Sequence, residues 1–340
     1  MKYIYPDYYH DFHCIAEHCP CTCCAGWAIE IDEASLNRYR QMKLESVDYE
    51  EGCFLQDGSS QKRCKNLCDN GLCQLILSHG DSILCDTCRL FPRHIEEFQG
   101  VREYSLSISC PEVARRLLER TEPITYQTLA DAEFDTEEYD DFEQSVYEEL
   151  SALRWKLIEL LNNEQVPLSL RCRNILDTVD AFQNQLDETE AVFHEVVSVK
   201  SFFRFMESWE FTNEDFPAIL KAADYSLFMS EAAEEIDSDG ADLLSLLDDD
   251  KLTKKLSRVI EYFLYTYLCG SVYDAYYYGM AQFCVGAAIH IKLLCDAHRM
   301  ATGSLSDSDV ERFTYLYARE LEHSIPNVLK TEAWMEENRI

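Results

Sequence analysis

The stretch Cys14-Ile-Ala-Glu-His-Cys19-Pro-Cys21-Thr-Cys23-Cys24 organises this chain, because it carries five cysteines in eleven residues. Seven further cysteines follow in the first third of the chain, namely Cys53, Cys64, Cys68, Cys73, Cys85, Cys88 and Cys110. Only four of the 16 cysteines lie beyond residue 110. This clustering predicts that the first third of the chain folds around something that thiolates hold.

The start of the chain bears on whether these thiols are reduced. Residues 1–7, Met-Lys-Tyr-Ile-Tyr-Pro-Asp, show neither the basic segment nor the apolar segment of a secretory signal. We therefore expect a cytoplasmic protein, and in a reducing compartment clustered cysteines are typical of metal sites. Disulfides and unligated core thiols are the alternatives. The chain has 340 residues, 47% of them hydrophobic, so its core does not depend on crosslinks for size.

The spacing of the cysteines leaves the metal open between zinc and an iron–sulfur cluster. Cys85 and Cys88 form a C-x-x-C pair, which can present two thiolates to one centre from a tight turn. The group at residues 19–24 is too irregular for a zinc-ribbon knuckle, and an iron–sulfur cluster tolerates such spacing better. Arg89 and Arg93 flank the pair and either offset the charge of a thiolate site or pair with carboxylates.

The hydrophobic pattern divides the chain into two parts. In the first part we expect short extended segments at 25–32 and 101–109, a helix over 33–43 capped by Asp32, and a turn or helix at 74–78. From residue 112 the apolar residues recur with the 3.6-residue period of helices. The expected helices cover residues 112–120, 142–161, 168–186, 190–209, 214–229, 241–247, 251–277, 281–300, 306–323 and 326–336, with caps that include Asn213, Asp239 and Ser306.

The predicted fold is therefore mainly α. Residues 1–116 form a small irregular Cys-rich metal-binding domain with short strands, and residues 117–340 form an acidic all-α helical array. An acidic segment at about 121–140 is predicted to link the two. The apolar run over 276–295 contains Gln282, His290 and Lys292, which indicates a buried central helix rather than a membrane span.

The charge is strongly negative and uneven. The net charge is −33; residues 1–116 carry 12 Lys and Arg against 18 Asp and Glu, and the remainder carries 18 against 45. Such a surface repels nucleic acid and anionic membranes and attracts a basic, lysine-rich protein. We therefore expect no nucleic-acid partner and no membrane partner. A solvated acidic surface that only aids solubility is the alternative.

Several catalytic motifs are missing from the sequence. It has no G-x-G-x-x-G after a strand, no P-loop and no alternation of strands and helices, which disfavours a Rossmann-type methyltransferase or dehydrogenase. The radical S-adenosylmethionine spacing C-x-x-x-C-x-x-C fails because Gly26 stands where the third cysteine is needed. No arrangement of His, Cys and Asp points to nucleophilic catalysis, and no catalytic residue is predicted.

The cysteine pattern resembles two nested families. Cys19-x-x-x-Cys23-Cys24, Cys64 with Cys73, and Cys88-Arg89-Leu90-Phe91-Pro92 resemble the zinc- or iron-chelating CxxCxxCC domain family. More of the chain resembles the flagellin lysine-N-methylases. The matching segments are Tyr3-Ile4-Tyr5-Pro6-Asp7-Tyr8-Tyr9, Cys23-Cys24-Ala25-Gly26-Trp27, Glu51-Gly52-Cys53-Phe54, Leu84-Cys85-Asp86-Thr87-Cys88-Arg89, Pro92-Arg93-His94-Ile95-Glu96-Glu97, Leu106-Ser107-Ile108-Ser109-Cys110-Pro111-Glu112-Val113-Ala114-Arg115, Tyr262-Phe263-Leu264-Tyr265 and Arg319-Glu320-Leu321-Glu322-His323-Ser324.

This resemblance implies a bacterial cytoplasmic methyltransferase that methylates lysine ε-amines of flagellin, with S-adenosylmethionine as the expected donor. It also implies an iron–sulfur cluster, [4Fe–4S], with zinc as the alternative. For a single cubane we expect the ligands Cys19, Cys23, Cys85 and Cys88. The further candidates are Cys14, Cys24, Cys64, Cys73 and Cys110. Cys21 and Cys68 depart from the family pattern and are left off the ligand set.

Two other functions stay open. One is a non-catalytic zinc- or iron-binding interaction protein whose acidic helices dock a basic partner, and the other is an electron-transfer protein. For a methyltransferase, the lysine must become a neutral amine, its stem needs an apolar or aromatic channel, and the sulfonium donor needs carboxylates or aromatic faces. Tyr276, Tyr277 and Tyr278 are candidates for such a channel, with core packing as their alternative role.

Overall fold

The structure is a computed structural model that describes residues 1–130, 142–186, 196–212, 215–230 and 242–340. The predicted helix caps Asn213 and Asp239 lie outside the described residues. So do residues 131–140 of the predicted linker and residues 190–195 of the helix predicted at 190–209.

A four-stranded sheet joins segments that are far apart in the sequence. Its strands are β1 (Lys2–Pro6), β4 (Arg93–Phe98), β5 (Val101–Leu106) and β6 (Tyr126–Ala130), in the order β4-β5-β1-β6. β1 runs parallel to β5, and the other two pairings are antiparallel. The pattern predicted β5 but not β1 or β4, and β6 lies in the segment predicted as a linker.

The rest of the described chain beyond residue 110 is helical. Its helices are α4 (Pro111–Leu118), α5 (Gln144–Leu161), α6 (Leu168–Leu186), α7 (Val199–Phe205), α8 (Asp215–Phe228), α9 (Thr253–Tyr267), α10 (Tyr277–Thr302), α11 (Asp307–Glu322) and α12 (Ile325–Glu337). Short 3-10 helices cover Met206–Ser208, Leu243–Leu247 and Leu268–Tyr273. The mainly α fold class is confirmed. The helix predicted over 251–277 is shorter than expected, because it tightens into a 3-10 helix at Leu268 and ends before Ala275, whose φ is +62°.

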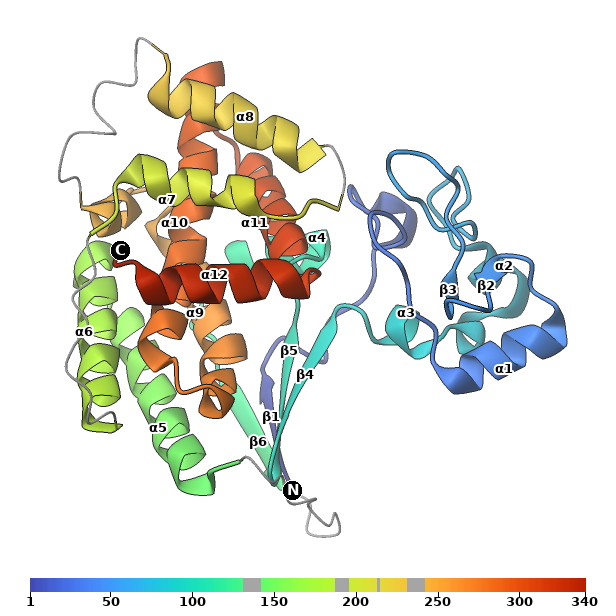
Figure 1. Ribbon diagram of the computed structural model, residues 1–340, viewed down its shortest axis with the longest axis horizontal. Helices are drawn as coiled ribbons and strands as arrows, with labels where there is room; N and C mark the ends of the chain where they lie inside the picture. Colours follow the sequence, from blue (N-terminus) through green and yellow to red (C-terminus); the bar gives the residue numbers. More distant parts are fainter. Residues whose placement is uncertain (131–141, 187–195, 213–214, 231–241) are drawn as a thin grey trace.

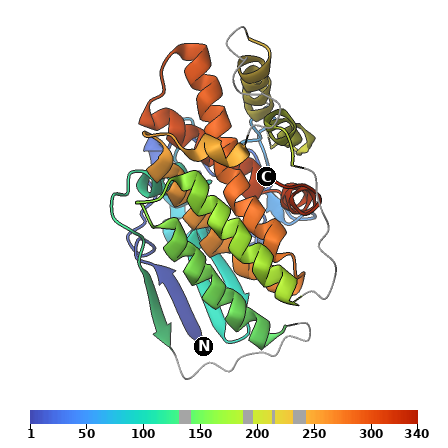
Figure 2. The same ribbon diagram turned by 90° about the vertical axis from the view of Figure 1, so that its left-hand side faces the viewer.

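Helix α10 is the centre of the array. It packs against α6, α8, α9, α11 and α12, and Figure 1 shows it running behind α7 and α12. Within the described residues it is the one helix long and apolar enough to cross a membrane, yet 94% of its most apolar 18 residues are buried in the protein. The prediction of a buried central helix is confirmed. α5 and α6 lie side by side along its flank (Figure 2).

Two helix starts behave as the sequence predicts. The Asp32 carboxylate accepts a hydrogen bond from the Ser35 amide at 2.8 Å and so caps α1 (Glu33–Met42). Ser306 and Asp309 form a reciprocal capping box at the start of α11. Such caps satisfy amide groups that have no partner inside the helix.

The buried residues form two separate cores. The smaller core lies in residues 25–91, which we name the Cys-rich lobe; it contains α1, α2 (Gln74–His79), α3 (Asp86–Leu90) and the strand pair β2 (Val47–Asp48) and β3 (Cys53–Phe54). The larger core unites the sheet with helices α4–α12, which together we name the body. Figure 1 shows the Cys-rich lobe projecting to one side of the body.

A buried ion pair fastens the sheet to the helices of the body. The Arg154 guanidinium on α5 donates to both carboxylate oxygens of Glu103 on β5, and Tyr147 donates to the same carboxylate at 2.9 Å. Arg154 also donates to the carbonyl of Tyr265 at 3.0 Å. The buried charges of Arg154 and Glu103 are thus paired with each other, which is the condition for burying them, although the Arg154 Nε has no hydrogen-bond partner.

Candidate functional site

Four cysteines of the Cys-rich lobe and of the loop before it meet as two pairs of thiols. All 16 cysteines of the chain are free thiols. Cys85 sits at the N-terminus of the short helix α3 and Cys88 lies within it, so the C-x-x-C spacing brings the two side chains together. The hydrogen bond from Cys88 lowers the pKa of Cys85 to about 7. In the same way, the hydrogen bond from Cys23 lowers the pKa of Cys24 to about 7.

These two pairs lie next to each other. The hydrogen bond to Cys85 and burial raise the pKa of Cys88, and the nearby charges of Cys24 and Cys23 raise it further. Cys64 and Cys73 also approach Cys24. Burial raises the pKa of Cys64 to about 11 and also raises the pKa of Cys73, and the charge of Cys24 adds to both shifts.

The other candidate ligands form a second group on the side of the body. Burial raises the pKa of Cys110 to about 11, and the charges of Cys19 and Cys14 contribute. Cys19 donates a hydrogen bond to the Cys21 carbonyl at 3.3 Å. Of the four ligands expected for a cubane, the structure thus places Cys23, Cys85 and Cys88 beside Cys24, and it places Cys19 with Cys14 and Cys110. The choice of ligands stays a prediction.

The donor chemistry of this region fits a thiolate-bound metal centre, because two thiols have a pKa that is lowered by a hydrogen bond from a neighbouring thiol. The fold brings them together in pairs. Within the described residues, no three side chains of His, Cys, Asp or Glu already lie close enough to hold one metal ion. A metal centre here would therefore draw neighbouring pairs together, and the candidates best placed for that are Cys23, Cys24, Cys85 and Cys88.

An arginine of the body that the sequence analysis did not single out binds residues 21–25, which we name the cysteine loop. Arg319 on α11 donates to the carbonyls of Thr22 and Ala25 and to the thiol of Cys21, each at 2.7 Å. The two arginines that flank the C-x-x-C pair are placed differently. Arg89 pairs with Asp86 at 2.7 Å, and Arg93 lies over the rings of Tyr9 and Phe12.

Beside this loop, the last residue of α11 carries a carboxylate surrounded by hydroxyl groups. Tyr262 donates to Glu322 at 2.6 Å, Ser107 donates to the other carboxylate oxygen, and Tyr267 also hydrogen-bonds to it. Burial raises the pKa of Glu322, while these hydrogen bonds and the nearby His94 oppose that rise. We name Glu322 with Ser107, Tyr262, Tyr267 and His94 the carboxylate cluster.

Two histidines border the carboxylate cluster. His94 lies 2.6 Å from a carboxylate oxygen of Glu96; burial lowers its pKa, but the hydrogen bond and charge of Glu96 produce a net rise. Burial lowers the pKa of His323 to about 4, so this imidazole is neutral at pH 7. His323 stacks on Trp27 with ring centroids 5.0 Å apart, and Trp27 in turn donates to the Cys23 carbonyl at 2.7 Å.

The tyrosines predicted as a channel are elsewhere. Tyr276 is exposed, Tyr277 packs against Phe182, and the Arg339 guanidinium lies over the Tyr278 ring. The structure supports the alternative role in packing for Tyr277 and Tyr278. The tyrosines that hydrogen-bond to Glu322 are instead Tyr262 and Tyr267.

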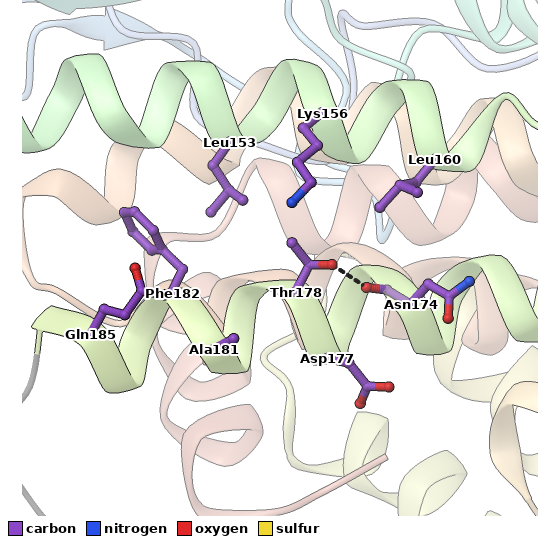
Figure 3. Close-up of a pocket in the computed structure, with 9 residues that line it drawn as sticks. All are labelled: Leu153, Lys156, Leu160, Asn174, Asp177, Thr178, Ala181, Phe182 and Gln185. Carbon is purple, nitrogen blue, oxygen red and sulfur yellow. Dashed lines mark hydrogen bonds between the residues drawn. The ribbon is translucent and has the colours of Figure 1, made fainter.

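A shallow groove lies apart from these residues, between α5 and α6, with a volume of about 560 Å³. Figure 3 shows Lys156 reaching from α5 toward Thr178 on α6, whose hydroxyl bonds the Asn174 carbonyl at 2.6 Å. Leu153, Leu160 and Phe182 supply apolar walls. The residues that line the groove include no thiol and no tyrosine.

Comparisons with known proteins show the family of this chain. Residues 154–340, which carry α9 and α11, match the FliB lysine N-methylase C-terminal domain, and the chain belongs to this family. The resemblance seen in the sequence is confirmed. The flagellar biosynthetic protein FliU of Salmonella muenchen is 27% identical over 126 residues, which are 33% of this chain and 75% of that protein.

Two proteins named lysine-N-methylase, from Salmonella choleraesuis strain SC-B67 and Salmonella typhimurium strain LT2, are also 27% identical over 126 residues. The match covers 33% of this chain and 31% of each of these proteins, so it spans about a third of their length. No solved structure is similar to this chain.

Proposed function

We propose that this chain is a protein-lysine N-methyltransferase that transfers a methyl group from S-adenosylmethionine to lysine ε-amines of flagellin. The observation that carries the proposal is the family match over residues 154–340, because that segment contains Tyr262, Tyr267 and Glu322 of the carboxylate cluster. A carboxylate beside tyrosines suits a substrate that arrives as a cation and must lose a proton before it reacts.

Flagellin as the substrate is supported by the names of the relatives and by the charge of the chain. One relative is named for flagellar biosynthesis. The net charge of −33 favours the approach of lysine-bearing surfaces, since complementary charge raises association rates. We place the reaction in the cytoplasm, before flagellin is exported.

We further propose that the thiol pairs hold a [4Fe–4S] cluster, with zinc as the alternative. Cys23, Cys85 and Cys88 are the ligands that both the spacing and the structure favour, and Cys24 and Cys19 compete for the fourth position. When bound, such a cluster supplies redox capacity and a rigid crosslink between its ligands. The residues of the chain itself would bind the substrate, orient it and move its proton.

The proposal is tested by incubating the anaerobically reconstituted, metal-loaded protein with S-adenosylmethionine and flagellin. Mass spectrometry is expected to find lysines that have gained the mass of one or more methyl groups. Flagellin whose lysine ε-amines have been acetylated is the matched control, and it should gain none. If fully loaded protein leaves every flagellin lysine unmodified, the proposed function is wrong.

A further inference from the structure

We propose that Glu322 receives the ε-ammonium of the substrate lysine and takes its proton, in a site bounded by Tyr262, Tyr267 and His94. This inference rests on the proposed function and assigns the acceptor side of the reaction to named residues. It follows from the partners of Glu322, from its position in the fold and from a comparison with the other buried carboxylates of the body.

The partners of Glu322 distinguish it from the structural carboxylates. Glu103 is paired with Arg154, Glu261 with Arg258, and Glu112 with Arg115. In the described part of the chain, Glu322 instead accepts hydrogen bonds from hydroxyl groups and has no ion pair with a lysine or arginine. Glu320 is also buried without such an ion pair, but the amide and hydroxyl of Thr212 hold its two carboxylate oxygens.

A carboxylate away from bulk water is costly unless a cation compensates it. The hydroxyl donors fix the direction of the carboxylate but carry no charge, and the nearby His94 offsets the carboxylate charge only while it is protonated. An incoming ammonium group is the ligand that supplies the missing positive charge, and it can donate hydrogen bonds to oxygens that accept more than one.

One edge of the carboxylate cluster is exposed. Glu322 itself is only partly buried, and the side chains of His94 and Glu96 are each 33% exposed. Glu322 ends α11 and His94 lies near the start of β4, on the side of the body that faces the Cys-rich lobe (Figure 1). The entry that we propose for the lysine side chain is at this exposed edge, between β4 and the end of α11.

The rings around the carboxylate suit the rest of the lysine side chain. Tyr267 packs within 5.9 Å of the His94 ring, and Tyr262 lies buried on the adjoining side. Aromatic faces stabilise a cation and also pack against an aliphatic stem. Burial raises the pKa of Glu322, which brings the carboxylate closer to the basicity that a proton acceptor needs.

The proposed step balances atoms and charge. The lysine ammonium gives one proton to the Glu322 carboxylate and becomes a neutral amine. The lone pair of its nitrogen then forms a bond to the methyl carbon of the sulfonium donor while the carbon–sulfur bond breaks. The donor leaves as a neutral thioether, the product is an N-methylated ammonium, and Glu322 returns its proton to water on the exposed side of His94.

The test compares Glu322→Gln with the wild-type protein in the flagellin methylation assay. Glutamine keeps the shape but cannot take a proton, so kcat is expected to fall at least about 100-fold while KM for flagellin changes less than about threefold. Glu311→Gln, on the same helix but outside the cluster, is the control and should keep the wild-type rate. Activity of Glu322→Gln within about threefold of wild type would overturn the inference.

Two further measurements keep the inference testable on its own. If Glu322→Gln does not fold, Tyr262→Phe is used, and it should lower kcat about tenfold because one hydrogen bond to the carboxylate is lost; an unchanged rate would count against the site. Binding of n-butylammonium to the wild-type protein, followed by saturation-transfer NMR, needs no methyl transfer. Glu322-dependent binding without any methylation would reject the proposed function but keep the ammonium site, whereas no binding would reject the site.

Discussion

The Cys-rich lobe and the body are held together by different forces. The lobe has only nine fully buried core residues, and two of them, Cys64 and Cys85, are cysteines. Its helices are short, and its strand pair has two residues in each strand. The body, in contrast, surrounds α10, of which 19 of 26 residues are buried. The body can be stable through apolar burial alone, whereas a core as small as that of the lobe would gain stability from the proposed metal crosslink.

The largest effect is expected from removing one thiol of the C-x-x-C pair. Cys85→Ser should abolish tight metal binding and unfold the lobe, because the metal supplies free energy of folding that nine core residues do not replace. Hydrogen exchange of amides in residues 25–91 should become at least about 100-fold faster, while amides of α10 keep their protection.

The matched control for this variant is Cys53→Ser. Cys53 lies in the same lobe on β3, and its pKa is raised by burial and by Asp48, Glu51 and Glu30 rather than by another thiol. The Cys53→Ser variant should keep the wild-type metal content and the wild-type protection of its amides against hydrogen exchange. If both variants lose metal and amide protection equally, the thiol pair has no special role in the lobe. If the amides of the lobe stay protected in Cys85→Ser, the apolar core is enough to keep the lobe folded.

A second difference is expected in the response of the body to acid. His290 on α10 is fully buried between Phe202 and Tyr317, and burial lowers its pKa from 6.5 to about 4. Between these two values the unfolded chain binds a proton that the folded chain does not. Folding stability is therefore lost as the pH falls from about 6.5 to about 4, by about 3 kcal/mol from this residue.

The measurement is chemical denaturation of the body at pH 7 and at pH 4, monitored by the tryptophan fluorescence of the helical region. His290→Gln removes the titrating group, so its stability should depend less on pH than that of the wild-type protein. The same loss in both proteins would mean that other groups dominate acid denaturation. Because His290 lies in the body, the His290→Gln substitution should not change metal release from the lobe.

The difference between the two regions also explains what the sequence could predict. Helices of the body follow a local period of 3.6 residues, so α5, α6 and α11 are predicted within a few residues. Strand β1 is short and pairs with β6, 120 to 128 residues away along the chain, and no local pattern contains that pairing. The carboxylate cluster could not be predicted for the same reason, because Ser107 and Glu322 are 215 residues apart in the sequence. The number of cysteines predicts a thiol-rich site, but which thiols lie next to one another across the lobe could be found only from the fold.

The smallest effect compares the same change in both regions, the removal of a helix cap. Ser306→Ala in the body should cost about 1 kcal/mol of unfolding free energy, since it removes one cap from a helix that is packed along its length. Asp32→Ala removes a cap from α1, but the Asp32 carboxylate also accepts from the Asp86 amide at 2.9 Å, next to Cys85.

The removal of the two caps should therefore have different local effects, although the loss of unfolding free energy is similar. Asp32→Ala is expected to loosen the start of α3, and so to lower the metal affinity of the Cys85 and Cys88 pair, while Ser306→Ala leaves it unchanged. Competition with a chelator measures this affinity directly. Because α3 has only five residues, its start has little other packing to hold it. If both variants keep the wild-type metal affinity, the geometry of the thiol pair is set by the loop after residue 80 and not by the contact between α1 and α3.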